Sequence, residues 1–245
     1  MRTVIVSGGG TGVGRATAGA FANGGADVHI LGRREQVLAR AASAINKQIG
    51  REAVHPHAVD LTDAAALEQL LPQLPGEIDV LVNNAGGAPG GDTESLRGFE
   101  RHLRAAFESN FLSAALLTEA LGSRLRRPGG RIVNVSSIAA LRGGGAAYAS
   151  AKAALLGLTY TLAAELGGDG ITVNAVAPGY ITDTEFFGEA MTPERHTRLV
   201  GQTLTGRPGT PNDVAAAIVY LASAEAGQVT AQVLQVNGGA LPGRG

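Results

Sequence analysis

Seven short apolar runs, each separated from the next by a longer segment with helical spacing, constrain the fold of this chain most. Several of the runs, such as those at residues 4–6 and 80–82, are apolar on consecutive residues rather than on alternate ones, which is typical of strands buried on both faces of a parallel sheet. Right-handed crossovers through the intervening helices then give a doubly wound sheet with helices on both faces. We expect strands at Thr3–Ser7, Val28–Leu31, Ala53–Val59, Val80–Val82, Arg131–Val135, Thr172–Val176 and Val233–Val236.

No linker, low-complexity tract or internal repeat interrupts this alternation, so residues 1–245 are expected to form one α/β domain. Two stretches depart from it. Residues 86–91 form a glycine-rich loop after the fourth strand, and residues 183–207 form a long insertion without strand character. The insertion is either a substrate lid or a helical hairpin packed on the core, and both remain open at this point.

Charge and composition exclude several classes of function. A net charge of -1 gives no field that would attract nucleic acid or an anionic membrane. The absence of cysteine excludes disulfides, thiolate catalysis and cysteine-zinc sites, and no metal site is expected. The apolar stretch at the N-terminus is too short for a signal peptide, and no run approaches the length of a membrane span. We therefore expect a cytoplasmic protein without nucleic-acid or membrane partners.

A glycine-rich turn follows the first expected strand and opens a helix expected at Arg15–Asn23. Residues 7–14 read S-G-G-G-T-G-V-G. Glycines here let the backbone approach a diphosphate, whose charge is favoured at the start of a helix. The spacing G-x-x-x-G-x-G differs from the strict G-x-G-x-x-G, and a tight turn without a ligand is the alternative. The strand before and the helix after favour a dinucleotide, with contacts expected at Gly8, Gly10, Thr11, Gly12 and Val13.

The end of the second expected strand indicates which dinucleotide is bound. An NAD-selective site carries an acidic residue there for the ribose 2′-hydroxyl, but this strand ends in Gly32, Arg33 and Arg34. Arg33, together with Arg34, is suited to clamp a 2′-phosphate. The alternative is an exposed basic pair at the start of a helix. The sequence predicts NADP(H) as the cofactor.

Tyr148 and Lys152 stand four residues apart in Y-A-S-A-K, and Lys152 is one of only two lysines in the chain. On a helix this spacing places both side chains on one face. A nearby ammonium is expected to lower the phenol's pKa from about 10, so that the tyrosine exchanges a proton near neutral pH. The alternative is a solvent-facing tyrosine beside a surface lysine.

Asn110 lies within an apolar seam whose members recur at alternating steps of four and three along a helix. An amide in such a seam must be hydrogen-bonded or it destabilises the fold. The amide therefore either serves a site or is a core asparagine satisfied by backbone. The seam consists of Leu103, Phe107, Asn110, Ala114, Leu117 and Leu121.

In this order the motifs resemble the short-chain dehydrogenase/reductase family over nearly the whole chain, in particular its 3-oxoacyl-(acyl-carrier-protein) reductases. The resemblance implies a Rossmann fold. The family's T-G-x-x-x-G-x-G appears with Ser7 in place of threonine. The other matching motifs are D-L-T at Asp60, N-N-A-G at residues 83–86, Y-x-x-x-K at Tyr148 and Lys152, P-G at Pro178 and Gly179, and V-N-G-G at residues 236–239.

The resemblance implies a catalytic set of Asn110, Ser137, Tyr148 and Lys152, in which Ser137 is preferred over Ser136 by alignment alone. Tyr148 would protonate the oxygen of a carbonyl that receives a hydride, and Ser137 would hydrogen-bond the same oxygen. Lys152 would bind the nicotinamide ribose, and Asn110 would hold a water that restores the proton through Lys152.

The resemblance also implies further cofactor contacts and an assembly. Asp60 would contact the adenine, and the backbone near Ile181 would hold the nicotinamide carboxamide. The helices expected at 101–121 and 148–166 would pair between subunits, which implies a homotetramer or a dimer. The remaining implied contacts are Leu61, Asn84, Ala85, Gly86, Tyr148, Lys152, Pro178 and Gly179.

Three departures from the family pattern concern the cofactor and the substrate. Ten residues separate Ser137 from Tyr148, about two fewer than in carrier-linked reductases. Asp169 replaces a basic residue expected there before the sixth strand, and Thr11 occupies a position that is often basic in NADP-using members. A basic group of Arg124, Arg126 and Arg127 is either a carrier-docking patch or, as we favour, a set of helix caps.

The leading hypothesis is an NADPH-dependent ketoreductase acting on a 3-oxoacyl thioester, a polyketide-like ketone or a small ketone. The alternative is a catalytically silent NADP-binding sensor or scaffold protein, which would need neither Ser137 nor Tyr148. An apolar substrate pocket is expected from Leu141, Phe186, Phe187 and Met191.

Overall fold

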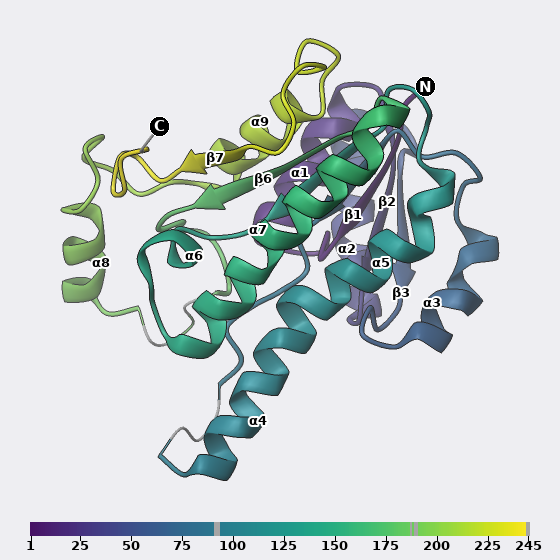
Figure 1. The fold of residues 1–245 in the computed structure, drawn as a ribbon. Coiled ribbons are helices and arrows are strands. Elements are labelled where there is room, and N and C mark those ends of the chain that lie inside the picture. The colour runs from purple at the N-terminus through teal and green to yellow at the C-terminus, as the bar shows by residue number, and fades with distance from the viewer. Residues whose placement is uncertain (91–93, 187, 189–190, 244–245) are drawn as a thin grey trace.

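The computed structural model describes residues 1–90, 94–186, 188 and 191–243, and Figure 1 shows its fold. The described part forms a seven-stranded parallel sheet in the order β3-β2-β1-β4-β5-β6-β7. The predicted doubly wound α/β fold is therefore confirmed. The strands are β1 (Thr3–Ser7), β2 (Asp27–Gly32), β3 (Val54–Ala58), β4 (Val80–Asn83), β5 (Arg131–Val135), β6 (Thr172–Pro178) and β7 (Val233–Val236).

Helices cover both faces of the sheet, because successive strand residues point to opposite sides. Val4 and Val6 of β1 belong to the core shared with α1, α2 and α9, whereas Ile5 belongs to the core shared with α3, α5 and α7. The helices are α1 (Gly12–Asn23), α2 (Glu35–Ile49), α3 (Ala64–Leu70), α4 (Leu96–Phe107), α5 (Ser113–Leu121), α6 (Ala139–Arg142), α7 (Ala146–Leu166), α8 (Pro193–Val200) and α9 (Pro211–Leu221).

Strand order reverses between β1 and β4, where an α/β sheet of this kind opens a crevice at the carboxyl ends of its strands. Ser7 joins the two sides of this crevice. Its hydroxyl accepts hydrogen bonds from the backbone N–H groups of Asn84 and Ala85, each at 2.9 Å. Serine in place of the family's threonine therefore still fastens the glycine turn to the loop after β4.

The continuous helix expected over 101–121 is interrupted. A π-helical turn (Glu108–Leu112) separates α4 from α5. Polar side chains compete there with the backbone ladder, since Ser109 Oγ donates to the Ala105 carbonyl at 2.7 Å and Asn110 Nδ2 donates to the Ala106 carbonyl at 2.9 Å. Single π turns of this kind are frequent at functional sites.

The insertion at 183–207 contains one helix among its described residues, α8, so a hairpin of two helices is not seen there. The lid interpretation stays a prediction. Thr192 caps α8 by accepting a hydrogen bond from the Arg195 N–H at 3.2 Å. Phe187 of the predicted pocket lies outside the described residues, as does Gly91 of the predicted loop.

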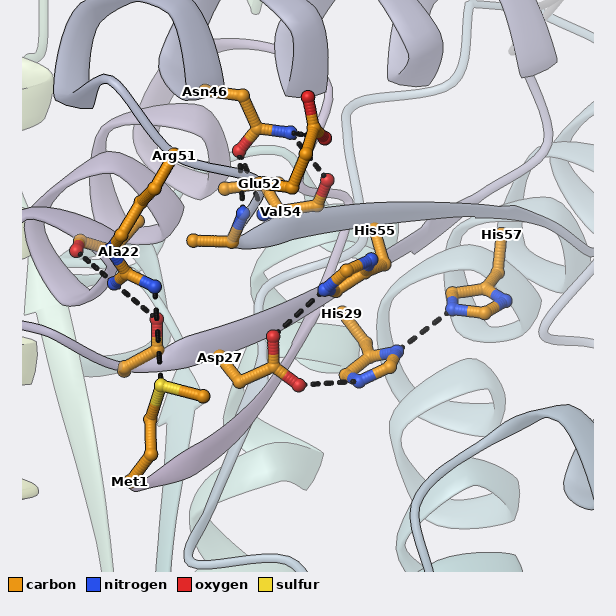
Figure 2. Close-up of polar contacts among 12 residues, drawn as sticks. Met1, Ala22, Asp27, His29, Asn46, Arg51, Glu52, Val54, His55 and His57 are labelled. Carbon is orange, nitrogen blue, oxygen red and sulfur yellow. Dashed lines mark hydrogen bonds and ion pairs between the residues drawn. The ribbon is translucent and has the colours of Figure 1, made fainter.

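A cluster of histidines and one aspartate joins β2 to the edge strand β3 (Figure 2). The strand register places His29 opposite His55. His29 Nδ1 lies 2.9 Å from His57 Nε2, and the Asp27 carboxylate lies 2.8 Å from His55 Nε2 and 3.4 Å from His29 Nε2. Burial is the main cause that lowers the pKa of His29 to about 4, and His57 adds to it.

Candidate functional site

A cavity of about 1080 Å³ extends along the carboxyl ends of the strands from the glycine turn to Tyr148. It is large enough for a dinucleotide, since ligand cavities typically measure about 300–1,000 Å³. Of the predicted apolar pocket, Phe186 lines this cavity, whereas Leu141 and Met191 do not. Every residue predicted for catalysis or cofactor binding lines the cavity except Asn110. The lining members are Gly8, Gly10, Thr11, Gly12, Val13, Arg33, Arg34, Asp60, Leu61, Asn84, Ala85, Gly86, Ser137, Tyr148, Lys152, Pro178, Gly179 and Ile181.

The glycine turn has a shape that side chains would prevent. Gly8 and Gly12 adopt positive φ angles of 65° and 48°. A Cβ atom at Gly14 would lie 2.2 Å from the Gly8 carbonyl oxygen and 2.5 Å from Asn84 Nδ2. Thr11 precedes α1 without a side-chain cap, so N–H groups at the helix start are available to an anion. The turn therefore fits the diphosphate of a dinucleotide.

Arg33 and Arg34 have different surroundings at the adenosine end of the cavity. Thr62 donates to Asp60 from its backbone N–H at 3.0 Å and its hydroxyl at 2.7 Å. These bonds are the main cause that lowers the pKa of Asp60, and the charge of Arg33 contributes. Arg34 forms an ion pair with Glu185 at 2.9 Å. The predicted two-arginine clamp thus has one member already engaged by a carboxylate.

Gly86 brings the loop after β4 close to two of the predicted catalytic residues. A Cβ atom at Gly86 would lie 2.5 Å from Asn110 Oδ1 and 3.1 Å from Lys152 Nζ. Only a glycine allows this approach. The Asn84 side chain, predicted to contact the cofactor, donates instead to the carbonyls of Ser7 and Gly8, at 3.0 and 3.2 Å.

Asn110 is fully buried behind the cavity wall and is paired with the backbone of Gly87. Its Oδ1 accepts from the Gly87 N–H at 3.0 Å, and its Nδ2 donates to the Gly87 carbonyl at 2.8 Å. The alternative of an asparagine satisfied by backbone therefore describes this structure. The side chain fixes the loop beside Lys152, and its water-holding role stays a prediction.

The geometry separates the two serines that follow β5. Ser136 is buried, and its hydroxyl donates to the Lys152 carbonyl at 2.8 Å. Ser137 lines the cavity and is hydrogen-bonded to Tyr148. Ser137, previously preferred by alignment alone, is therefore the one placed to contact a ligand.

Lys152 reaches Tyr148 from one turn further along α7. Its Nζ lies 5.9 Å from the centroid of the phenol ring and donates to the Val135 carbonyl at 2.8 Å. Burial lowers the pKa of Lys152 to about 8. Burial also raises the pKa of Tyr148 to about 12, and the hydrogen bond with Ser137 opposes that rise. The expected lowering of the phenol's pKa is wrong, because desolvation of the buried hydroxyl is the largest cause of the shift.

This chain is similar to known proteins along most of its length. A family model described as Enoyl-(Acyl carrier protein) reductase matches residues 8–240. The chain is 36% identical over 248 residues to the short-chain reductase protein NovJ of Streptomyces niveus, covering 96% of this chain and 92% of that protein. The chain belongs to the short-chain dehydrogenase/reductase family. It is accordingly an oxidoreductase of a family that works with a nicotinamide cofactor.

Other members of this short-chain dehydrogenase/reductase family carry different substrates in their names. The 3-oxoacyl-[acyl-carrier-protein] reductase FabG of Escherichia coli is 34% identical, over 97% of this chain and 96% of that protein. The crystal structure of levodione reductase superposes with a TM-score of 0.89 at 28% identity, covering 97% of this chain and 96% of that one. The relatives of this chain thus share its family but carry names with different substrates.

In this short-chain dehydrogenase/reductase the basic group of Arg124, Arg126 and Arg127 is engaged within the chain. Arg126 pairs with Glu77 and Asp79, each at 2.8 Å, and Arg127 pairs with Asp169 at 2.9 Å. Arg124 donates to three backbone carbonyls, those of Leu71, Leu74 and Pro75. Arg126 and Arg127 are therefore paired with carboxylates of the same chain, whereas Arg124 is held by backbone carbonyls.

Several residues that line the part of the cavity near Tyr148 were not predicted from the sequence. The Tyr180 hydroxyl lies 2.8 Å from His196 Nδ1 and so connects the segment after β6 to α8. Phe186, in contrast, was predicted, and the centroid of its ring lies 5.2 Å from the centroid of the Tyr148 ring. Tyr180 occupies the variable position of the P-G-x-I stretch, which was the only available signal. The unpredicted lining residues include His102, Ile138, Arg142, Tyr180, Arg195 and Leu199.

The described part of the chain was also expected to lack a metal site and a membrane span. No group of three or more histidine, aspartate or glutamate residues among them is arranged to hold a metal ion. No helix in the described part of the chain is long and apolar enough to span a bilayer.

Proposed function

We propose that this protein is an NADPH-dependent ketoreductase that reduces a carbonyl to a secondary alcohol. The observation that carries the proposal is the hydrogen bond between Ser137 and Tyr148, beside the buried Lys152, in a cavity continuous with the glycine turn. A silent binding protein would need the glycine turn but not this arrangement.

Tyr148 acts as the general acid. A nicotinamide cofactor, when bound, supplies the hydride that reaches the carbonyl carbon. With a pKa raised to about 12, the Tyr148 hydroxyl is protonated at neutral pH and can donate to the carbonyl oxygen as negative charge develops there. Ser137 hydrogen-bonds the same oxygen and thereby orients the carbonyl.

Lys152 stabilises the phenolate that Tyr148 becomes once its proton has been given away. The ammonium uses one N–H on the Val135 carbonyl and has two further donors. One of them serves the nicotinamide ribose in this proposal. With its pKa lowered to about 8, Lys152 remains mostly protonated at neutral pH. It can also pass a proton to Tyr148, and Asn110 holds the neighbouring loop for that step.

The cofactor lies along the cavity in this proposal. The glycine turn receives the diphosphate, Asp60 contacts the adenine, and the backbone near Ile181 receives the carboxamide. Arg33 provides the contact to the 2′-phosphate that distinguishes NADP(H) from NAD(H). Its proximity to Asp60 supports this position at the adenosine end.

The substrate class is a 3-oxoacyl thioester or a polyketide-like or small ketone. The names of the relatives, which include 3-oxoacyl-[acyl-carrier-protein] reductases and a levodione reductase, support a ketone. Phe186 and Leu199 give the mouth of the cavity an apolar character. The ion pair between Arg127 and Asp169 argues against carrier docking at that surface.

A homotetramer or dimer is the proposed assembly, in the cytoplasm. Phe99 of α4, Leu112 of the π turn and Tyr160 of α7 are exposed apolar or aromatic side chains on the elements expected to pair. Second copies of the chain would cover them.

The function is tested by following NADPH and NADH oxidation with three carbonyl compounds: an acyl thioester, a cyclic ketone and a quinone. Turnover of a ketone with a preference for NADPH supports the proposal. Tight NADPH binding without turnover of any carbonyl compound would instead favour the silent sensor or scaffold.

A further inference from the structure

Three consecutive residues, Thr184, Glu185 and Phe186, cross the cavity from its adenosine end to Tyr148, and we call them the strap. A Cβ atom on Gly12 of the glycine turn would lie 3.3 Å from Thr184 Cγ2. Glu185 is paired with Arg34, and Phe186 packs against the Tyr148 ring. The strap therefore lies against the glycine turn, the adenosine end of the cavity at Arg34, and Tyr148.

The ends of the strap suit a segment that moves. Asp183, directly before it, has a φ of 55°, and Gly188, just after it, has a φ of 46°. Left-handed backbone is uncommon outside glycine and is found at hinges and switch regions. The only ion pair that holds the strap among the described residues is Arg34–Glu185, in which the side chains are 60% and 64% exposed. Exposed pairs are weak and easily exchanged.

We propose that Glu185 competes with the cofactor's 2′-phosphate for Arg34, so that a phosphorylated cofactor releases the strap and uncovers Tyr148. This inference rests on the proposed NADPH-dependent function. A 2′-phosphate carries about -1.5 to -2 charges and three acceptor oxygens, so it replaces a carboxylate on a guanidinium. A 2′-hydroxyl carries no charge and leaves the pair in place. Glu185 is thus a residue that determines cofactor specificity. It affects the substrate's access to Tyr148 as well as the affinity for the phosphorylated cofactor.

Glu185→Gln separates this inference from simple phosphate binding. Calorimetric titration with adenosine 2′,5′-bisphosphate, which has no nicotinamide, should show binding about 1.5- to 5-fold tighter in Glu185→Gln than in wild type. Titration with ADP, which lacks the 2′-phosphate, should give the same affinity in both. Glu100→Gln, which removes an exposed pair with Arg104 on α4, is the matched control and should change neither.

Release of the strap has its own readout in hydrogen exchange. Adenosine 2′,5′-bisphosphate should speed exchange at residues 184–186 of wild type, whereas ADP should not, and Glu185→Gln should exchange fast without ligand. In turnover with NADH, kcat should rise in Glu185→Gln relative to wild type.

The outcomes distinguish the competition of Glu185 for Arg34 from the underlying preference for a phosphorylated cofactor. Equal affinity of wild type and Glu185→Gln for adenosine 2′,5′-bisphosphate, or unchanged exchange at the strap, would overturn the competition while leaving NADPH selectivity intact. Failure of both proteins to prefer adenosine 2′,5′-bisphosphate over ADP would overturn the selectivity itself, and the inference with it.

Discussion

Ser137, just after β5, and Tyr148, in the first turn of α7, are hydrogen-bonded to each other although ten residues separate them. Burial raises the pKa of the phenol, and this bond is the contact that opposes the rise. The fold thus brings the Tyr148 phenol, the proposed general acid, next to the Ser137 hydroxyl, which is proposed to orient the carbonyl.

The two neighbouring serines give a matched pair of variants. Ser137→Ala should lower kcat about 10²-fold, because it removes the group that orients the carbonyl oxygen. Ser136→Ala removes a buried bond to the Lys152 carbonyl and should lower the free energy of unfolding by about 1 kcal/mol while retaining most turnover. Steady-state kinetics and urea denaturation of both variants check this, and the reverse ranking of their kcat values would disprove the assignment.

Arg33→Asp should reverse or abolish the preference for NADPH. The substitution removes a positive charge at the adenosine end and places a carboxylate where an NAD-selective enzyme has one. The ratio of kcat/KM for NADPH to that for NADH is the measurement. Equal use of both cofactors by the wild type would already contradict the selectivity.

Gly14→Ala should destabilise the glycine turn and weaken cofactor binding at least tenfold, because its Cβ atom would lie 2.2 Å from the Gly8 carbonyl oxygen. Gly19→Ala, on the same helix, meets its nearest atom at 4.0 Å and should raise stability by up to about 1 kcal/mol. Thermal unfolding and NADPH titration compare the two. Similar behaviour of the two variants would show that the turn does not need the glycine.

Stability should fall in acid because of His29. Its pKa is lowered to about 4 in the folded chain, against about 6.5 when unfolded, so the unfolded state binds more protons between these values. The stabilisation is complete above pH 6.5 and is lost as the pH falls toward 4, by about 3 kcal/mol. Asp27, His55 and His57 face the ring.

Urea denaturation from pH 7 to 4.5 tests this, with His29→Gln expected to show a shallower loss of stability than wild type. His196→Gln, in α8 and away from the β2–β3 cluster, is the control and should follow wild type. Parallel pH profiles for His29→Gln and wild type would refute the assignment to His29.

The alternation of short apolar runs with helical segments predicted every strand. The central strands β4, β5 and β6 are buried along their whole length, which requires mostly apolar residues, whereas the edge strands β3 and β7 are only partly buried. The ends moved by one or two residues: Ala53 and Val59 fall outside β3, and β6 continues to Pro178. Helical periodicity missed the π turn at Asn110, because side chains that hydrogen-bond the preceding turn leave the apolar pattern unchanged.

Within the site, the sequence motifs together with the family resemblance predicted which residues line the cavity, but not the charges that these residues meet. The pairing of Arg34 with Glu185 joins residues 151 positions apart, which no local pattern reveals. The direction of the Tyr148 pKa shift was missed for a similar reason, since it depends on burial and therefore on the whole fold.

Turnover by Tyr148→Phe tests the central claim most directly. The variant keeps the ring and loses only the hydroxyl, so NADPH should bind as in wild type while kcat with a reducible ketone falls by about 10²- to 10⁴-fold. Tyr160→Phe, on the exposed face of the same helix, should retain wild-type kcat. A Tyr148→Phe enzyme that reduces the ketone at the wild-type rate would contradict the account.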